Sequence, residues 1–211
     1  MRTFLERDLP QLGITIAPAA MRRFWTMLAH YHAQTWNASE LSRSMGLSDK
    51  TVRSYLDILT GAFMVRQLQP WHENLGKRQV RAPKIYLRVT VFLLHLLNID
   101  SQSTLWGHPK SGASWEGFAL EQILSAMRPT EAYFWATHSG AELDLLMTHK
   151  GKRYGFEIKL NEAPSISGSM RTAVEALSLA RLYIVYPGAH TGVIDDKISL
   201  LPLSDIPNLK L

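Results

Sequence analysis

The sequence predicts a mixed α/β (α+β) protein built from two modules, and three observations support this prediction. Apolar residues recur every three or four positions between residues 19 and 34, as one buried face of a helix requires. Three shorter helical patterns, the last at about residues 91–97, and two strand-like segments follow before residue 98. After residue 112, helical segments interleave with segments that alternate apolar and polar residues, which is typical of a sheet flanked by helices.

Composition and charge favour a protein that binds an anionic partner and exclude sites that depend on cysteine. The 211 residues include 23 Lys and Arg against 18 Asp and Glu, a formal net charge of +5 that favours an anionic partner such as DNA. The chain has no Cys, which excludes a disulfide framework, thiolate zinc ligands and a cysteine nucleophile. No stretch is long and apolar enough to span a membrane, so we expect a cytoplasmic protein without a membrane partner.

The first eighteen residues are predicted to form an arm or linker. Pro10, Gly13 and Pro18 interrupt any periodic pattern in this segment. We expect the arm to dock on a larger body, such as an ATPase domain or a partner protein.

Residues 19–98 are predicted to form a winged-helix-like module. After the long helix, a short helix ends near Gly46, and Ser48 can cap a second helix at helix-turn-helix spacing. Two strand-like segments then flank a loop at residues 74–77, as in a hairpin wing.

Exposed residue types near the start of the second helix and on the wing are the candidates for contacting nucleic acid, because recognition helices and basic wings place their contacts there. These candidates are Lys50, Thr51, Arg53, Lys77, Arg78 and Arg81. A basic face is also often merely solvated, and winged helices also dock on proteins, so both alternatives stay open.

Residues 99–211 are predicted to form the second module, which a polar stretch rich in Ser and Gly separates from the first. Its expected elements are a helix at 114–127, strands at 132–137, 142–148 and 153–160, a helix at 167–179, and strands at 181–186 and 197–201.

An acidic hairpin is the most informative part of the second module. Alternate side chains of a strand share a face, so Glu142 and Asp144 point one way, as do Glu157 and Lys159. If Lys150 and Gly151 form a two-residue turn, Asp144 faces Glu157 and Glu142 faces Lys159. Two facing carboxylates with Cβ atoms about 5 Å apart repel one another unless a cation lies between them.

A divalent metal ion is the cation that we expect there. Mg²⁺ or Mn²⁺ suits a site with two carboxylates, here Asp144 and Glu157, and keeps most of its waters. Lys159 could then orient a bound water or stabilise developing charge. The alternative is structural: Glu142 and Lys159 form an exposed ion pair, and Asp144 and Glu157 are simply hydrated.

The same residues resemble the PD-(D/E)XK phosphodiesterase motif. Glu157-Ile158-Lys159 matches its second half as written, whereas Leu143 stands before Asp144 where the motif usually has proline. The resemblance implies a restriction-endonuclease-like domain with a central mixed sheet flanked by helices. It also implies a supporting acid from the preceding helix, for which Glu116 is the candidate and Glu121 the fallback.

A longer resemblance covers nearly the whole chain, which is similar to the C-terminal region of unknown function in bacterial and archaeal AAA-type ATPases. The stretches that carry it are LERDLPQLGI, WNASELSRSMGLSDKTVRSYLDIL, KIYLR, SWEGFALEQIL, THSGAELDLL and FEIK. The resemblance implies an ATPase domain as partner. The sequence has no G-x-x-x-x-G-K-[ST] phosphate loop, so we expect no ATP site and no ATPase activity from this chain.

Two functional hypotheses follow. The first is a DNA-associated, metal-dependent phosphodiesterase, or its inactive descendant, with Asp144 and Glu157 as ligands and Lys159 and Glu116 beside them. The second is a non-catalytic adaptor that binds DNA or protein for an ATPase.

Overall fold

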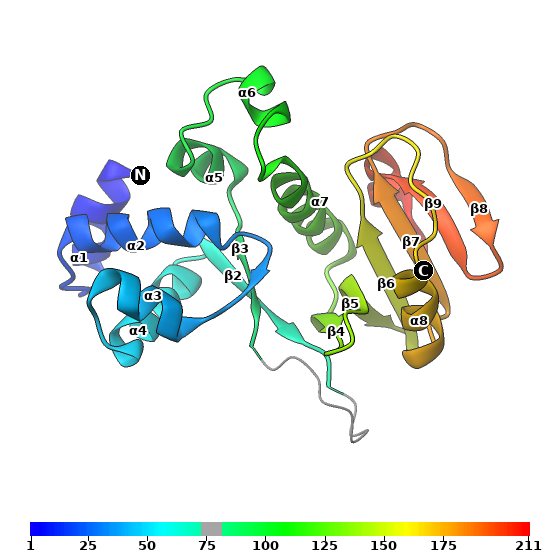
Figure 1. Cartoon of the computed structure of the whole chain (residues 1–211), viewed down its shortest axis with the longest axis horizontal. Coiled ribbons are helices and arrows are strands. Elements are labelled where there is room, and N and C mark those ends of the chain that lie inside the picture. Colours follow the sequence, from blue (N-terminus) through cyan, green and yellow to red (C-terminus); the bar gives the residue numbers. More distant parts are fainter. Residues whose placement is uncertain (73–81) are drawn as a thin grey trace. The chain divides into compact units, whose positions relative to one another are not determined.

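The computed structural model describes residues 1–72 and 82–211 as a mixed α/β fold with a mixed sheet (Figure 1). The predicted loop at 74–77 and the candidates Lys77, Arg78 and Arg81 lie outside the described residues. Contacts divide the chain into two units. The first contains residues 1–67 and 85–111, and the second contains residues 68–84 and 112–211. The strand segment at 68–70 and Lys84 therefore belong to the second unit, upstream of the boundary expected near residue 99.

The first unit is mainly helical. Its helical elements are η1 (Phe4–Asp8), α1 (Leu9–Gln11), α2 (Pro18–His30), α3 (Ala38–Met45), α4 (Asp49–Gly61), α5 (Thr90–Leu96) and α6 (Gln102–Trp106). Its strands are β1 (Gln34–Thr35) and the parts of β2 (Val65–Pro70) and β3 (Lys84–Leu87) that lie in this unit. The helices predicted to start near residue 19, end near Gly46 and begin after Ser48 are confirmed.

The expectation of an arm at residues 1–18 requires correction. Leu5 and Leu9 are buried, and the ring of Phe4 meets that of Trp25 edge-on at 5.6 Å. Leu5 and Leu9 are four residues apart, so one helical face can bury both. The segment is thus part of the core of the first unit.

Polar contacts fix the turn between α3 and α4. Gly46 ends α3 with a φ of 68°, a left-handed conformation that glycine adopts without strain. The Ser48 side chain caps α4 by accepting the backbone N–H of Thr51. Asp49 accepts hydrogen bonds from Ser39 Oγ at 2.9 Å and Ser42 Oγ at 2.5 Å, which join the two helices and lower the pKa of its carboxyl.

The second unit is a mixed sheet with helices. Its elements are α7 (Ser111–Met127), β4 (Ala132–Ala136), β5 (Glu142–His149), β6 (Lys152–Ile158), α8 (Gly168–Ala176), β7 (Arg181–Tyr186), β8 (Gly192–Asp195), β9 (Ile198–Pro202) and η2 (Leu203–Asn208). The end of β2 runs parallel to β4, and the order continues β4-β5-β6-β7-β9-β8. Pairing is antiparallel from β4 to β6, parallel from β6 through β7 to β9, and antiparallel between β9 and β8.

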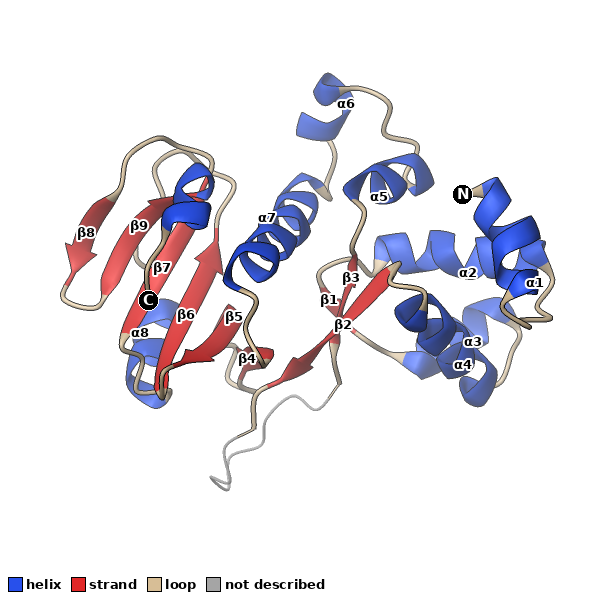
Figure 2. Ribbon diagram, turned by 180° about the vertical axis from the view of Figure 1, so that it is seen from behind, coloured by secondary structure: helices blue, strands red, loops and turns tan. Residues whose placement is uncertain are grey.

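Helix α8 covers one face of this sheet, where it packs on β5, β6 and β7 (Figure 2). An apolar cluster fills the space between them, and its members are Trp135, Leu143, Leu146, Met170, Ala173, Leu177, Leu179, Leu182, Ile184 and Ile198. None of the helices in the described part of the chain is long and apolar enough to cross a bilayer.

The β5–β6 hairpin confirms the predicted turn and the register of residues 145–149 with residues 152–156. His149 pairs with Lys152, and Leu145 pairs with Phe156. Lys150 and Gly151 have φ values of 49° and 74°, as a two-residue turn of type I′ requires.

Strict alternation along β5 does not hold. The β4–β5 register shifts between Tyr133 and Trp135, so β5 has one extra residue there, as in a β-bulge. Leu143 and Leu146 consequently join the same apolar cluster, although strict alternation would place them on opposite faces.

Candidate carboxylate and lysine site

Six charged residues of the second unit form one electrostatic network, named here the carboxylate cluster. They are Lys84 from the start of β3, Glu116 from α7, Glu142 and Asp144 from β5, and Glu157 and Lys159 from the end of β6. The structure therefore places the four predicted catalytic residues, Glu116, Asp144, Glu157 and Lys159, in one network.

Among the described residues, Lys84 has three carboxylate neighbours, although only 5% of its surface is exposed. Its Nζ pairs with Glu142 Oε1, and lies 3.5 Å from Glu116 Oε1 and 3.6 Å from Asp144 Oδ1. Burial lowers the pKa of Lys84, but the three carboxylates outweigh burial and raise that pKa well above its usual range. Lys84 is therefore a charged ammonium group inside the protein.

Asp144 joins the two strands of the hairpin. The backbone N–H of Ile158 donates to Asp144 Oδ2 at 2.9 Å, while Oδ1 faces Lys84. This contact fixes the orientation of the carboxylate before any ligand arrives.

Glu157 is the least satisfied member of the carboxylate cluster. Its side chain is only 8% exposed, and its Oε1 accepts a hydrogen bond from Lys159 Nζ at 2.6 Å. Its Oε2 is buried and has no hydrogen-bond partner among the described residues. Burial, and then the negative charge of Asp144, raise the pKa of Glu157 to about 7, although Lys159 acts in the opposite direction.

The ion pairs differ from those that simple pairing predicts. The sequence suggested that Glu142 faces Lys159, whereas Glu142 pairs with Lys84 and Lys159 pairs with Glu157. Burial lowers the pKa of Lys159, but Glu157 outweighs it and raises that pKa. Of the two candidates on α7, Glu116 rather than the fallback Glu121 approaches Lys84.

Lys84 is a site residue that the sequence analysis did not single out. The feature of the sequence that could have indicated it is the apolar run Ile85-Tyr86-Leu87 directly after Lys84, which is typical of a strand buried on both faces. The structure buries all four residues of this strand. A lysine in a strand buried on both faces needs an acidic partner.

The carboxylate cluster contains the type of ligand that a divalent metal ion such as Mg²⁺ prefers. Within residues 1–72 and 82–211, no three Asp, Glu or His side chains are grouped so that they could hold a metal ion. Mg²⁺ commonly uses only one or two protein carboxylates and completes its shell with water and phosphate oxygens. Glu157, whose buried Oε2 has no hydrogen-bond partner among the described residues, interacts electrostatically with Asp144, and this pair of carboxylates fits that requirement.

The candidates for nucleic-acid contact lie at the start of α4. Lys50 and Arg53 are exposed, whereas Thr51 is half-buried and its Oγ1 lies 2.8 Å from Ser48 Oγ. Thr51 therefore helps to build the helix cap, and Lys50 and Arg53 are the accessible pair.

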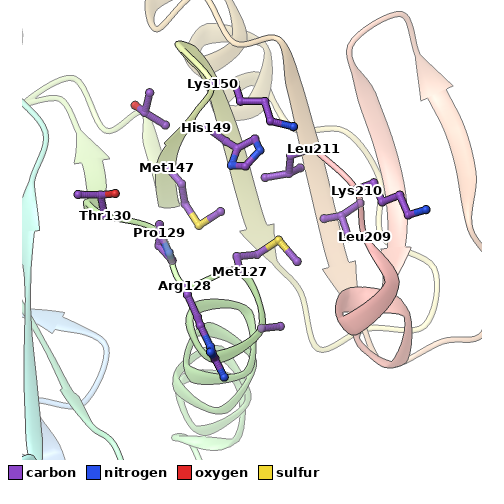
Figure 3. Close-up of a pocket in the computed structure, with 12 residues that line it drawn as sticks. Met127, Arg128, Pro129, Thr130, Met147, His149, Lys150, Leu209, Lys210 and Leu211 are labelled. Carbon is purple, nitrogen blue, oxygen red and sulfur yellow. The ribbon is translucent and has the colours of Figure 1, made fainter.

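A separate pocket lies at the turn end of the β5–β6 hairpin (Figure 3). It has a volume of about 570 Å³, and its lining includes Met127, Met147, His149, Leu209 and Leu211. No member of the carboxylate cluster lines it. The pocket and the carboxylate cluster are therefore distinct features of the second unit.

Two domain families of unknown function match the chain. Residues 1–103 match the family described as domain of unknown function DUF8612, and residues 111–206 match domain of unknown function DUF4143. The first match ends at residue 103 and the second begins at residue 111, where the first unit ends.

Two mycobacterial proteins resemble the chain over most of its length. They are the uncharacterized protein Rv2008c of Mycobacterium tuberculosis and the uncharacterized protein Mb2031c of Mycobacterium bovis, each 54% identical over 204 residues. These matches cover 97% of this chain but only 46% of each relative. The chain thus spans less than half the length of these relatives.

Two solved structures align weakly. The transcriptional regulator PA3341 is 23% identical, with 60% of this chain and 89% of that chain covered and a TM-score of 0.26. Protein VC1899 from Vibrio cholerae is 14% identical, with 90% and 54% covered and a TM-score of 0.26. Alignments this weak do not define the fold of either unit.

Proposed function

We propose that the chain is a DNA-associated, metal-dependent phosphodiesterase with a winged-helix-like first module and a PD-(D/E)XK-like second module. The observation that carries this proposal is the buried Glu157, whose Oε2 has no hydrogen-bond partner in the described part of the chain and whose carboxylate interacts electrostatically with that of Asp144. A buried pair of this kind is destabilising unless a cation satisfies it. Lys159, 2.6 Å from Glu157, supplies a donor at the same place.

Four residues of the carboxylate cluster have distinct tasks in this proposal. Asp144 and Glu157 would hold Mg²⁺ or Mn²⁺, which when bound polarises the phosphodiester and lowers the pKa of a water molecule. Lys159 donates a hydrogen bond to the attacking water or to a phosphate oxygen, where negative charge develops. Glu116 adds a further carboxylate from α7.

The first unit would supply affinity for nucleic acid. Lys50 and Arg53 lie within the first turns of α4, whose N-terminus is fixed by Ser48 and Asp49. Exposed cations on a fixed helix start can contact phosphates or base edges.

Cleavage assays test the proposed reaction. Plasmid and branched DNA are incubated with the protein and either Mg²⁺ or Mn²⁺, and we expect metal-dependent strand cleavage. Asp144→Asn and Lys159→Met should each lower the rate by about a hundredfold or more, since each removes a group from the reacting centre. Asp196→Asn and Lys197→Met are matched controls at exposed positions outside the carboxylate cluster. Cleavage that survives in both site variants would contradict the proposal.

A non-catalytic adaptor is the second candidate, and one observation favours it. The ammonium group of Lys84 already neutralises part of the charge of Glu116, Glu142 and Asp144, as in a purely structural ion-pair network. An adaptor would bind DNA without cutting it under any metal ion, and Asp144→Asn would leave binding unchanged.

By family resemblance, we propose an ATPase domain as the partner of either candidate. The mycobacterial relatives are longer than this chain, and the segment that this chain does not match is the candidate for that ATPase domain. Co-expression of that segment with this chain, followed by size-exclusion chromatography, should give one co-eluting peak. Separate elution would contradict the partnership.

A further inference from the structure

The position of Lys84 relative to Asp144 has a consequence for metal binding. Asp144 Oδ2 already accepts the Ile158 backbone N–H, so Oδ1 is the oxygen better placed to bind a new cation. That oxygen faces the Lys84 Nζ at 3.6 Å. A divalent ion on Asp144 and the ammonium group of Lys84 would therefore be close, like charges in a buried site, where they repel strongly.

The ammonium group of Lys84 makes a close contact with only one of its three carboxylate neighbours in the described part of the chain. Short charge-assisted hydrogen bonds from an ammonium group to a carboxylate measure about 2.7–2.9 Å. Lys84 reaches Glu142 closely, but its distances to Glu116 and Asp144 are 3.5 and 3.6 Å. Glu142 is 45% exposed in its side chain, so the closest partner of Lys84 lies toward solvent. The Lys84 side chain can therefore follow Glu142 outward without losing its tightest contact.

We propose that Lys84 is an internal counter-cation that holds the site in a metal-free state and must leave Asp144 when a divalent cation binds. This inference rests on the proposed metal-dependent function and adds a regulatory step to it. In the metal-free state, Lys84 neutralises Asp144. In the metal-bound state, Asp144 and Glu157 hold the divalent ion, and Lys84 remains with Glu142 nearer the surface.

The protection of lysines against acylation distinguishes the two states. A lysine reacts with an acylating reagent through its neutral amine, which must also be accessible. Lys84 is buried, so it should stay unlabelled without metal. With Mn²⁺ or Mg²⁺ at saturation, labelling of Lys84 should rise at least about tenfold as the side chain moves outward. Lys152 and Lys197 are exposed controls whose labelling should not change.

Metal binding itself supplies the second measurement. The affinity for Mn²⁺ is measured by calorimetry for the wild type and for Lys84→Gln, after circular dichroism has verified that the variant is folded. The apparent affinity of the wild type is the intrinsic affinity multiplied by the fraction of time that Lys84 leaves Asp144 free. If that fraction is about a tenth or less, Lys84→Gln should bind Mn²⁺ about tenfold more tightly or better. If Lys84→Gln does not fold, labelling of the wild type alone decides the question.

The outcomes separate this inference from the proposed function. Metal binding with increased labelling of Lys84 supports both. Metal binding with Lys84 still protected, or with unchanged affinity in Lys84→Gln, overturns the inference and leaves the metal-dependent function standing. Absence of Mn²⁺ binding by both the wild type and Lys84→Gln overturns both.

Discussion

The backbone N–H of Ile158 donates a hydrogen bond to Oδ2 of Asp144 at 2.9 Å, so this aspartate joins β5 to the end of β6. The proposed metal ligand therefore also has a structural task. Substitutions at position 144 must therefore distinguish the loss of the proposed metal ligand from the loss of the hydrogen bond to Ile158.

Asp144→Ala should destabilise the protein more than Asp144→Asn does. Alanine leaves the buried Ile158 N–H without its acceptor, which costs about 1–3 kcal/mol, whereas the Asn carbonyl can still accept that bond. Urea unfolding of both variants measures the difference. Equal free energies of unfolding would show that the hydrogen bond contributes little.

The pKa of Glu157 predicts a pH-dependent stability. Because this pKa rises from 4.5 to about 7 on folding, the native state binds the proton more tightly than the unfolded chain does. The resulting stability is fully present below pH 4.5 and is lost as the pH rises through 7. Relative to Glu157→Gln, the wild type should lose roughly 2–3 kcal/mol between pH 5 and pH 8.

Urea unfolding at both pH values, in the presence of a chelator, measures this loss. The comparison with Glu157→Gln cancels the contribution of histidines that titrate in the same range. A difference between the two proteins that stays constant with pH would contradict the assigned burial of Glu157.

Gly155 is the position in the hairpin where close packing should matter most. A Cβ atom there would lie 2.7 Å from Leu179 Cδ1 and 3.1 Å from Leu143 Cδ2. Gly155→Ala should therefore cost about 1–3 kcal/mol, and Leu179→Ala should partly relieve that cost in the double variant. Gly168→Ala is the matched control, since its added Cβ atom would meet nothing within 4 Å.

Lys50 and Arg53 should contribute to DNA affinity through phosphate contacts. The double variant Lys50→Ala/Arg53→Ala should bind DNA more weakly and lower the slope of log affinity against log salt by about two. Fluorescence anisotropy at several salt concentrations measures both quantities, with Lys197→Ala as control. If the slope of log affinity against log salt did not change, Lys50 and Arg53 would contact a protein partner or solvent and not DNA.

Local patterns predicted the secondary structure well because the information lies in neighbouring residues. The Lys150-Gly151 turn set the hairpin register, and Gly46 and Ser48 marked helix ends. The short helix α6 and strand β8 were missed, since β8 is four residues long and mostly exposed. The burial of Leu5 and Leu9 was also missed, because the prolines and glycine of that segment masked their helical spacing.

The candidate site was only partly predictable, for a different reason. Asp144, Glu157 and Lys159 lie on one hairpin, so strand geometry alone could bring them together. Lys84 reaches Asp144 from another strand, 60 residues earlier in the sequence, and no local pattern encodes that contact. The bulge in β5 was equally hidden, since Glu-Leu-Asp-Leu-Leu suits a regular strand as well as a bulged one.

The second unit is assembled from two separate stretches of chain, and this sets a condition for excising it. A fragment cut at residue 99 would lose Gln69 and Pro70, the strand partners of Tyr133 and Phe134. The bare edge of β4 would then invite self-association. The same cut would remove Lys84, so the fragment's acidic groups would repel one another, and its behaviour toward metal ions would not represent the intact protein.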